Sequence, residues 1–132
     1  LQYLIEEEKL ARDVYLYLAE NVTSSKFSNI AKSEQTHMDQ IAAVLKTYNY
    51  FNPTTTRAPG VFRDKSLQAL YNTLITQGSV DVAAAFQVGR DIENLDIKDL
   101  QVMLKATMPA DMKLALDNLL KGSYNHLAAF NR

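Results

Sequence analysis

The sequence predicts an all-α protein, a four-helix bundle in which one long crossover connection carries a short extra helix. Apolar residues recur at spacings of three and four along four long stretches, as on the inner faces of amphipathic helices. Strand signals are weak, because no Asn-Gly or Asp-Gly pair marks a hairpin turn. Two of the connections are short and one is long, which favours two antiparallel helical hairpins joined by a crossover.

The first hairpin joins helices expected over residues 2–22 and 26–48. The polar string Thr23-Ser24-Ser25 separates them, and its hydroxyls can cap the second helix. A connection this short makes the two helices antiparallel neighbours.

The crossover begins with the clearest break in the chain, residues 49–60, which contain Pro53, Pro59 and Gly60. A short helix is expected over 65–77, where apolar residues again recur at helical spacing.

The second hairpin joins a long helix expected over 80–107, with Ser79 as its cap, to a last helix that ends near Asn131. Pro109 lies between them and suits both a sharp turn and the first turn of a helix.

Composition narrows the function classes. The chain has 132 residues, 47% of them hydrophobic and 22% charged, which fits one domain over residues 1–132 of a soluble globular type. A net charge of −1 without a basic cluster predicts no nucleic-acid partner, and no apolar run reaches the length of a membrane span. No cysteine is present, which excludes thiolate metal sites and cysteine nucleophiles. Leu1 already belongs to a helical pattern, as in a trimmed chain, and both a cytoplasmic and an exported location are compatible with it.

Polar residues interrupt the inward faces of the four long helices. Carboxylates are almost never fully buried unless something pairs with them, and no Lys or Arg shares these faces. A bound metal is the pairing that this pattern predicts. The residues concerned are Glu8, Glu34, His37, Glu93, Asp96 and His126.

The positions of these residues agree with the predicted hairpins. In an antiparallel hairpin, residues at the same height are symmetric about the turn. Glu8 and Glu34 are symmetric about Asn21, and Glu93 and His126 about the Pro109 turn. Each hairpin therefore brings its own polar residues to one level.

The residue types fit a pair of divalent ions. Glu34-x-x-His37 places a carboxylate and an imidazole one helical turn apart, as in carboxylate-bridged dimetal proteins. Carboxylate and imidazole ligands suit iron, manganese or zinc. Four carboxylates would balance the charge of two divalent ions, whereas without metal their mutual repulsion would raise their pKa values.

Each residue alone has an ordinary interpretation. Glu8 could favour a helix dipole, His37 could be a hydrogen-bonded core residue, and Asp96 could lie at the rim of the bundle. Tyr15 and Arg12 are candidates for contacts around the site, with core packing and surface exposure as their respective alternatives.

Longer motifs resemble the rubrerythrin-like branch of the ferritin superfamily. Residues 8–15 (Glu-Lys-Leu-Ala-Arg-Asp-Val-Tyr) resemble its first helix, and residues 30–37, with Ala-x-x-Glu-x-x-His, its second. Glu93-x-x-Asp96 resembles its paired third-helix carboxylates, with Asp replacing Glu, and His126 matches its fourth-helix histidine.

The whole chain also resembles an uncharacterised ferritin-like family of bacteria and archaea. Its marks are Glu-Glu-Glu-Lys-Leu-Ala-Arg-Asp-Val-Tyr near the start, Gln-Gly-Ser before the third long helix, and Gly-Ser-x-Asn-His-Leu over residues 122–127. The resemblance implies a ferritin-like fold and metal binding but no particular reaction.

Two departures from rubrerythrins bear on activity. Gly122 and Ser123 stand where their fourth helix supplies a further Glu, with Ser123 as a residue beside the site, and the cysteine-rich iron module is absent. Both weaken the expectation of peroxidase turnover and leave room for an asymmetric site, or one holding zinc.

Three functions follow. The first is a protein with two divalent ions, iron favoured over manganese or zinc, that acts as a non-haem di-iron oxidase or peroxidase on O₂ or peroxide. The second binds metal without turnover, for sequestration, sensing or structure. The third is a metal-free interaction module with Tyr48, Tyr50 and Phe51 as its surface. A homodimer is compatible with the resemblance.

Overall fold

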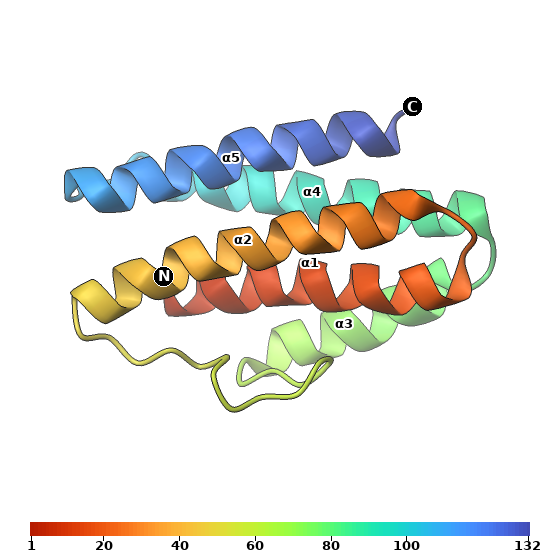
Figure 1. The fold of residues 1–132 in the computed structure, drawn as a ribbon, viewed down its shortest axis with the longest axis horizontal. Coiled ribbons are helices and arrows are strands. Elements are labelled where there is room, and N and C mark those ends of the chain that lie inside the picture. The colour runs from red at the N-terminus through yellow and green to blue at the C-terminus, as the bar shows by residue number, and fades with distance from the viewer.

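The computed structural model describes residues 1–132 and is all-helical, as predicted (Figure 1). Four long helices form the bundle, and a short one lies in the crossover. The helices are α1 (Gln2–Asn21), α2 (Ser25–Thr47), α3 (Lys65–Gly78), α4 (Val82–Met103) and α5 (Ala110–Phe130). Figure 1 shows α1 antiparallel to α2 and α4 antiparallel to α5, which confirms the two predicted hairpins.

Side-chain caps start three of the helices. Ser24 accepts a hydrogen bond from the Lys26 N–H at 3.3 Å, as the polar string before α2 predicted. The cap of α4 is Asp81, which accepts from the Ala84 N–H at 2.7 Å. The expectation that Ser79 caps this helix is therefore wrong, and its hydroxyl donates to the Ile75 carbonyl of α3 instead. Asp64 caps α3.

The predicted end of α4 at Thr107 is four residues too late. The helix stops at Met103, and the N–H groups of Leu104, Lys105 and Ala106 form turn hydrogen bonds. Pro109 then stands at the cap position of α5. The residue before a proline disfavours helical geometry, so the chain uses several residues to reverse its direction.

The hydrophobic core consists of two clusters. One includes Leu18, Phe27 and Phe130, and the other includes Leu4 and Leu119. Each long helix contributes to both clusters. The polar residues of the four predicted inward faces lie between the two clusters in sequence along every long helix.

Gly89 on α4 allows close packing in the first cluster. A Cβ atom there would lie 2.7 Å from the ring of Phe130, well inside van der Waals contact. The ring of Phe130 therefore rests on the backbone of α4.

α1 is buried on nearly all sides because the crossover and α3 cover the face that α2 and α4 leave free. The ammonium of Lys9 lies 2.7 Å from Asp13 and 2.8 Å from the carbonyls of Ala58 and Val61. Asp13 also accepts from the Gly60 N–H at 2.9 Å. A fully buried ion pair thus fixes the crossover backbone.

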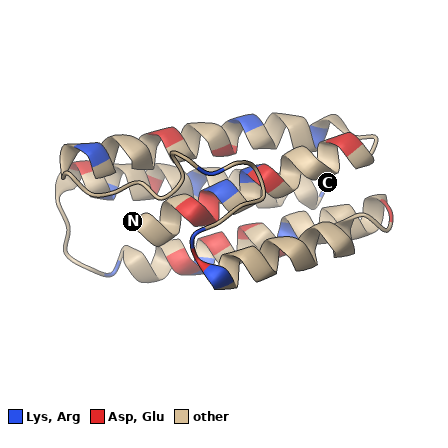
Figure 2. Cartoon of the chain, turned by 90° about the horizontal axis from the view of Figure 1, so that it is seen from below, with Lys and Arg blue, Asp and Glu red and all other residues tan.

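Glu6 completes this contact. Its carboxylate accepts from the backbone N–H groups of Arg63, at 2.5 Å, and Asp64, at 3.1 Å. We call Glu6, Lys9 and Asp13 the crossover anchor. Figure 2 shows the acidic and basic segments of α1 beneath the crossover loop.

None of the five helices combines the length and the apolar character that crossing a membrane requires.

Candidate metal centre

The structure brings the predicted polar residues into the interior of the bundle. The carboxylates of Glu8, Glu34 and Glu93 are fully buried, and so is Asp96. The histidines are 5% exposed at His37 and 7% at His126. We call these six buried residues the polar layer. They come from α1, α2, α4 and α5, so the layer forms only if the two hairpins meet at one height. The sequence left that relation open.

The first group of three consists of Glu8, Glu34 and His37. Nδ1 of His37 lies 3.2 Å from Oε2 of Glu34 and 3.5 Å from Oε2 of Glu8. One ligand atom from each residue lies within 4.8 Å of the others, a spacing that one metal ion can bridge.

The second group consists of Glu34, Glu93 and His126. Nδ1 of His126 lies 2.8 Å from Oε1 of Glu34 and 3.5 Å from Oε1 of Glu93. Glu34 thus belongs to both groups and turns a different oxygen to each histidine. The two imidazole rings are stacked with centroids 5.5 Å apart. A carboxylate shared in this way is the arrangement that bridges two metal ions.

The buried oxygens lack enough donors. Neither oxygen of Glu8 or Asp96 has a hydrogen-bond partner, and one oxygen of Glu93 has none. Unpaired buried carboxylates are costly, so native proteins rarely keep them without a compensating cation or proton. Oxygen and imidazole atoms of this kind fit a divalent metal ion.

The pKa shifts of these groups agree with the shortage of hydrogen-bond donors. Burial first, and then the charge of Glu34, raises the pKa of Glu8 well above its usual value and that of Glu93 to about 7. Burial opposes ionisation of Glu34 too, but its close contacts with Glu8, His126 and His37 hold its pKa below the ordinary value. Burial lowers the pKa of His126, but its contacts with Glu34 and Glu93 outweigh this effect and raise it to about 10. Without metal, the layer therefore holds extra protons.

Two hydroxyl groups orient these residues from outside. The phenol of Tyr15 donates a hydrogen bond to Oε2 of Glu93 at 2.6 Å. Nε2 of His126 lies 2.9 Å from the Ser33 hydroxyl. Ser33 precedes Glu34 on α2, and nothing in its sequence context distinguished it from a surface serine.

Gly122 makes room for His37. A Cβ atom on Gly122 would overlap Nε2 and Cε1 of the imidazole, so no side chain fits between α5 and His37. Ser123, one turn before His126, is fully buried and its hydroxyl has no partner. Gly122 and Ser123 therefore have separate places on the inner face of α5.

Asp96 and Glu7 lie beside the two groups without belonging to either. The strongest charge acting on Asp96 is that of Glu8. Glu7, which the sequence reasoning passed over, is fully buried and has no hydrogen-bond donor on either oxygen. Its spacing of three and seven from Leu10 and Val14, both buried, was the signal that could have revealed it.

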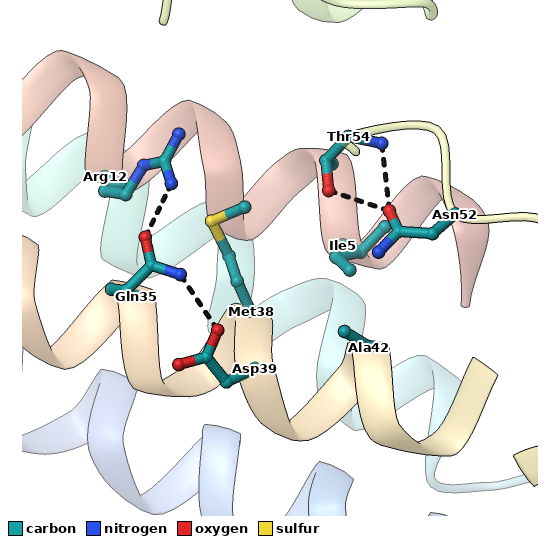
Figure 3. Close-up of a pocket in the computed structure, with 8 residues that line it drawn as sticks. All are labelled: Ile5, Arg12, Gln35, Met38, Asp39, Ala42, Asn52 and Thr54. Carbon is teal, nitrogen blue, oxygen red and sulfur yellow. Dashed lines mark hydrogen bonds between the residues drawn. The ribbon is translucent and has the colours of Figure 1, made fainter. Parts of the chain in front are cut away.

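Arg12 lies outside the layer. Its guanidinium bonds to Asp13 at 2.9 Å and to Gln35 at 2.6 Å, and Gln35 continues the chain to Asp39 at 2.9 Å. Figure 3 shows the hydrogen bonds from Arg12 to Gln35 and from Gln35 to Asp39, in a groove between α1 and α2 that Met38 also lines. The groove holds about 200 Å³ and includes no residue of the layer.

Fold and site together define an all-α bundle with a buried carboxylate and histidine layer. The chain belongs to the family described as uncharacterized protein domain DUF2202, whose model matches residues 1–132. The uncharacterized protein MJ0754 of Methanocaldococcus jannaschii is 45% identical over 127 residues, which cover 96% of this chain and 69% of that protein.

The crystal structure of hypothetical protein MJ0754 from the same archaeon superposes with a TM-score of 0.94 at 44% identity. The match covers 97% of this chain and 73% of that one. The predicted resemblance to an uncharacterised family is thereby confirmed at the level of this family.

Proposed function

We propose that the protein is a ferritin-like metal-binding protein that holds two divalent ions in the polar layer. Glu8 and His37 would bind one ion, Glu93 and His126 the other, and Glu34 would bridge them. The single observation that carries the proposal is that Glu34 turns one oxygen to each histidine-containing group. Asp96, next to Glu8, would complete the ligand set of the first ion.

Iron is the ion that we favour, with manganese and zinc as alternatives, because the donors are all carboxylate and imidazole. A pair of ferrous ions would supply electrons to O₂ or peroxide. We therefore propose that the iron-loaded protein acts as an oxidase or peroxidase. Around the site, the Tyr15 phenol keeps its proton, since burial raises the pKa of this phenol well above its usual value, and it donates a hydrogen bond to Glu93. The apolar clusters on both sides exclude water from the layer.

The test is metal content after purification without added metal or chelator, measured by elemental mass spectrometry. We expect two ions per chain in the wild type and fewer than one in Glu34→Ala, because both ions lose a ligand. Glu20→Ala, an exposed position on α1, is the matched control and should keep both ions. Two ions per chain in Glu34→Ala would contradict the proposal, and metal-free, stably folded wild type would favour an interaction module instead.

A second candidate is metal binding without turnover. None of the surface hollows of the molecule includes a residue of the layer, so the site has no preformed entrance for a large substrate. An experiment that distinguishes an oxidase or peroxidase from metal binding without turnover is to load the protein with Fe²⁺ under argon and then mix it with air or peroxide. If the absorbance of ferric iron grows faster than in a solution of free Fe²⁺, the result supports the oxidase or peroxidase. If it does not, the result supports sequestration or a structural role.

A further inference from the structure

The two histidines of the polar layer have similar inner contacts but different outer contacts. Each imidazole turns Nδ1 to the carboxylates of the layer. On the outer side, Nε2 of His126 reaches from α5 to α2 and lies 2.9 Å from the Ser33 hydroxyl. Nε2 of His37 points the opposite way, from α2 to α5, and meets Gly122 there. His37 therefore has no side chain opposite it that could act as Ser33 acts for His126.

This difference bears on how firmly each ring is held. A neutral imidazole that binds an ion through Nδ1 carries its proton on Nε2, and metal-bound histidines almost always donate that proton to an acceptor. The acceptor fixes the orientation of the ring and strengthens its bond to the metal. The Ser33 hydroxyl is placed to accept from His126. The hydrogen bond of His37 uses Nδ1, so its Nε2 is left without an acceptor from the protein.

Gln40 on α2 has the complementary deficit. Its side-chain oxygen is buried and has no hydrogen-bond donor, although the residue as a whole is half-buried. Every other buried oxygen without a partner belongs to the polar layer, to Glu7 or to Ser123. A buried amide oxygen without a donor is costly, so native proteins usually pair such an atom.

The donor and the acceptor lie on one face of α2. Gln40 follows His37 by three residues, which makes their side chains neighbours on the helix. Side chains of a helix lean toward its N-terminus, so the Gln40 amide is directed over the preceding turn, where His37 lies. A hollow of about 240 Å³ between α2 and α5, lined by Gln40, Val44 and Ala115 among others, gives the amide room to turn.

We propose that Gln40 is the positioning residue of His37 and that its side-chain oxygen accepts the Nε2 proton when Nδ1 binds the first ion. It would hold the His37 ring as Ser33 holds the ring of His126. This inference rests on the proposed function, because the proton is fixed on Nε2 only when a metal ion occupies Nδ1. Since the two rings have separate outer partners, the two ions can be weakened one at a time.

The spectroscopic test uses the Co²⁺-loaded protein and proton NMR, in which the Nε2 protons of metal-bound histidines give strongly shifted, exchangeable signals. We expect two such signals in the wild type. Ser33→Ala should speed the exchange of one signal with solvent, which identifies it as that of His126. Gln40→Leu should speed the exchange of the other, because the His37 proton then has only water as an acceptor.

Two further variants make this test specific. Gln40→Glu keeps an acceptor at the same place, so the His37 signal should exchange slowly again and move in frequency, because a carboxylate is the stronger acceptor. Gln35→Leu is the matched control on the same helix. Its exposed amide bonds to Arg12 and Asp39 outside the polar layer, so both signals should stay as in the wild type.

The affinity test is a titration with Mn²⁺ followed by electron paramagnetic resonance. Gln40→Leu should weaken the binding of one ion by about 10- to 100-fold and leave the other unchanged. Gln40→Glu should restore the affinity of the weakened ion. Gln35→Leu should bind both ions like the wild type.

Several results would overturn the assignment of Gln40. One is wild-type exchange and affinity in Gln40→Leu, and another is an equal change of both signals, which indicates a general loss of packing. An unchanged His37 signal in Gln40→Glu would overturn it even if Gln40→Leu does not fold. All three results leave the proposed function intact. A wild type that binds no stoichiometric Co²⁺ or Mn²⁺ would contradict both proposals.

Discussion

Two buried clusters of charge lie on opposite sides of α1 and differ in how their charges are balanced. In the crossover anchor, Lys9 binds Asp13 and two carbonyls, and Glu6 binds two N–H groups. In the polar layer, Glu8 has no hydrogen-bond donor on either oxygen, and neither has Glu7 beside it. The anchor is complete within the protein and serves the fold, whereas the layer is incomplete and requires something that the chain does not supply.

The comparison predicts mutational effects of opposite sign. Removing one member of a completed ion pair leaves a buried charge without a partner, so stability should fall. Neutralising a carboxylate that never had a partner removes a cost that the metal-free protein already carries, so stability should rise.

The largest effect is expected for Lys9→Met. This change removes the fully buried cation from Asp13, which keeps only the partly exposed Arg12 beside it, and leaves two carbonyls without a donor. The free energy of unfolding should fall by about 3 kcal/mol. The measurement is urea denaturation followed by circular dichroism.

The matched control is Lys113→Met, which breaks an ion pair with the same spacing and a similar distance, 2.8 Å to Asp117 against 2.7 Å in the anchor. That pair is exposed, and its loss should cost less than about 1 kcal/mol. Equal losses for the two variants would show that burial does not distinguish the pairs.

A gain is expected for Glu8→Gln in the presence of a chelator. The amide keeps the shape of the side chain and can donate to Glu34, so the free energy of unfolding should rise by about 1–3 kcal/mol. Added Mn²⁺ should raise the melting temperature of the wild type but not of this variant. If the metal-free variant is less stable than the metal-free wild type, the Glu8 carboxylate has a stabilising partner other than a metal ion, and this prediction is wrong.

The metal-free protein should lose stability as the pH rises from about 5 to 9. Burial raises the pKa of Glu7 to about 9 and of Glu93 to about 7, and contacts with Glu34 and Glu93 raise that of His126 to about 10. The folded protein therefore keeps protons that the unfolded chain releases, and each such proton contributes a slope of about −1.4 kcal/mol per pH unit. Glu7→Gln should flatten this dependence, whereas Asp91→Asn should not. A stability that rises over this range would contradict the assignment of these protons.

The smallest effect is expected for Tyr15→Phe. It removes one hydrogen bond to Glu93, at a cost of about 1 kcal/mol in the metal-free protein. The ring still packs against Phe27 and Phe130, so the fold should persist. Calorimetry of the variant, with and without Mn²⁺, would show whether the hydroxyl acts on the fold or on the ions: a larger loss with metal indicates the ions.

The sequence predicted the bundle well because helical spacing, caps and loop lengths are local properties. It also selected the members of the two groups, since a carboxylate on an apolar face is conspicuous whatever packs against it. The height at which the hairpins meet depends on the crossover, whose buried contacts join Lys9 to residues about fifty positions later. Such contacts have no local signal.

Glu7 and the crossover anchor were missed for a different reason. A helix at the centre of a fold has several buried faces, so a polar residue off the main apolar stripe need not face solvent. Lys9 and Asp13, four residues apart, look the same in sequence as the exposed pair of Lys113 and Asp117. Only the covering crossover distinguishes them.

The division of the hydrophobic core into two clusters has a consequence for cooperativity. The four long helices pass through both clusters, but between them the contacts are made by charged groups and not by apolar packing. Without ions, each half of the bundle forms a unit that can open with little effect on the other, so the ends of one helix can differ in hydrogen-exchange protection. With ions in place, ligands from all four helices join the halves, and the molecule unfolds as one.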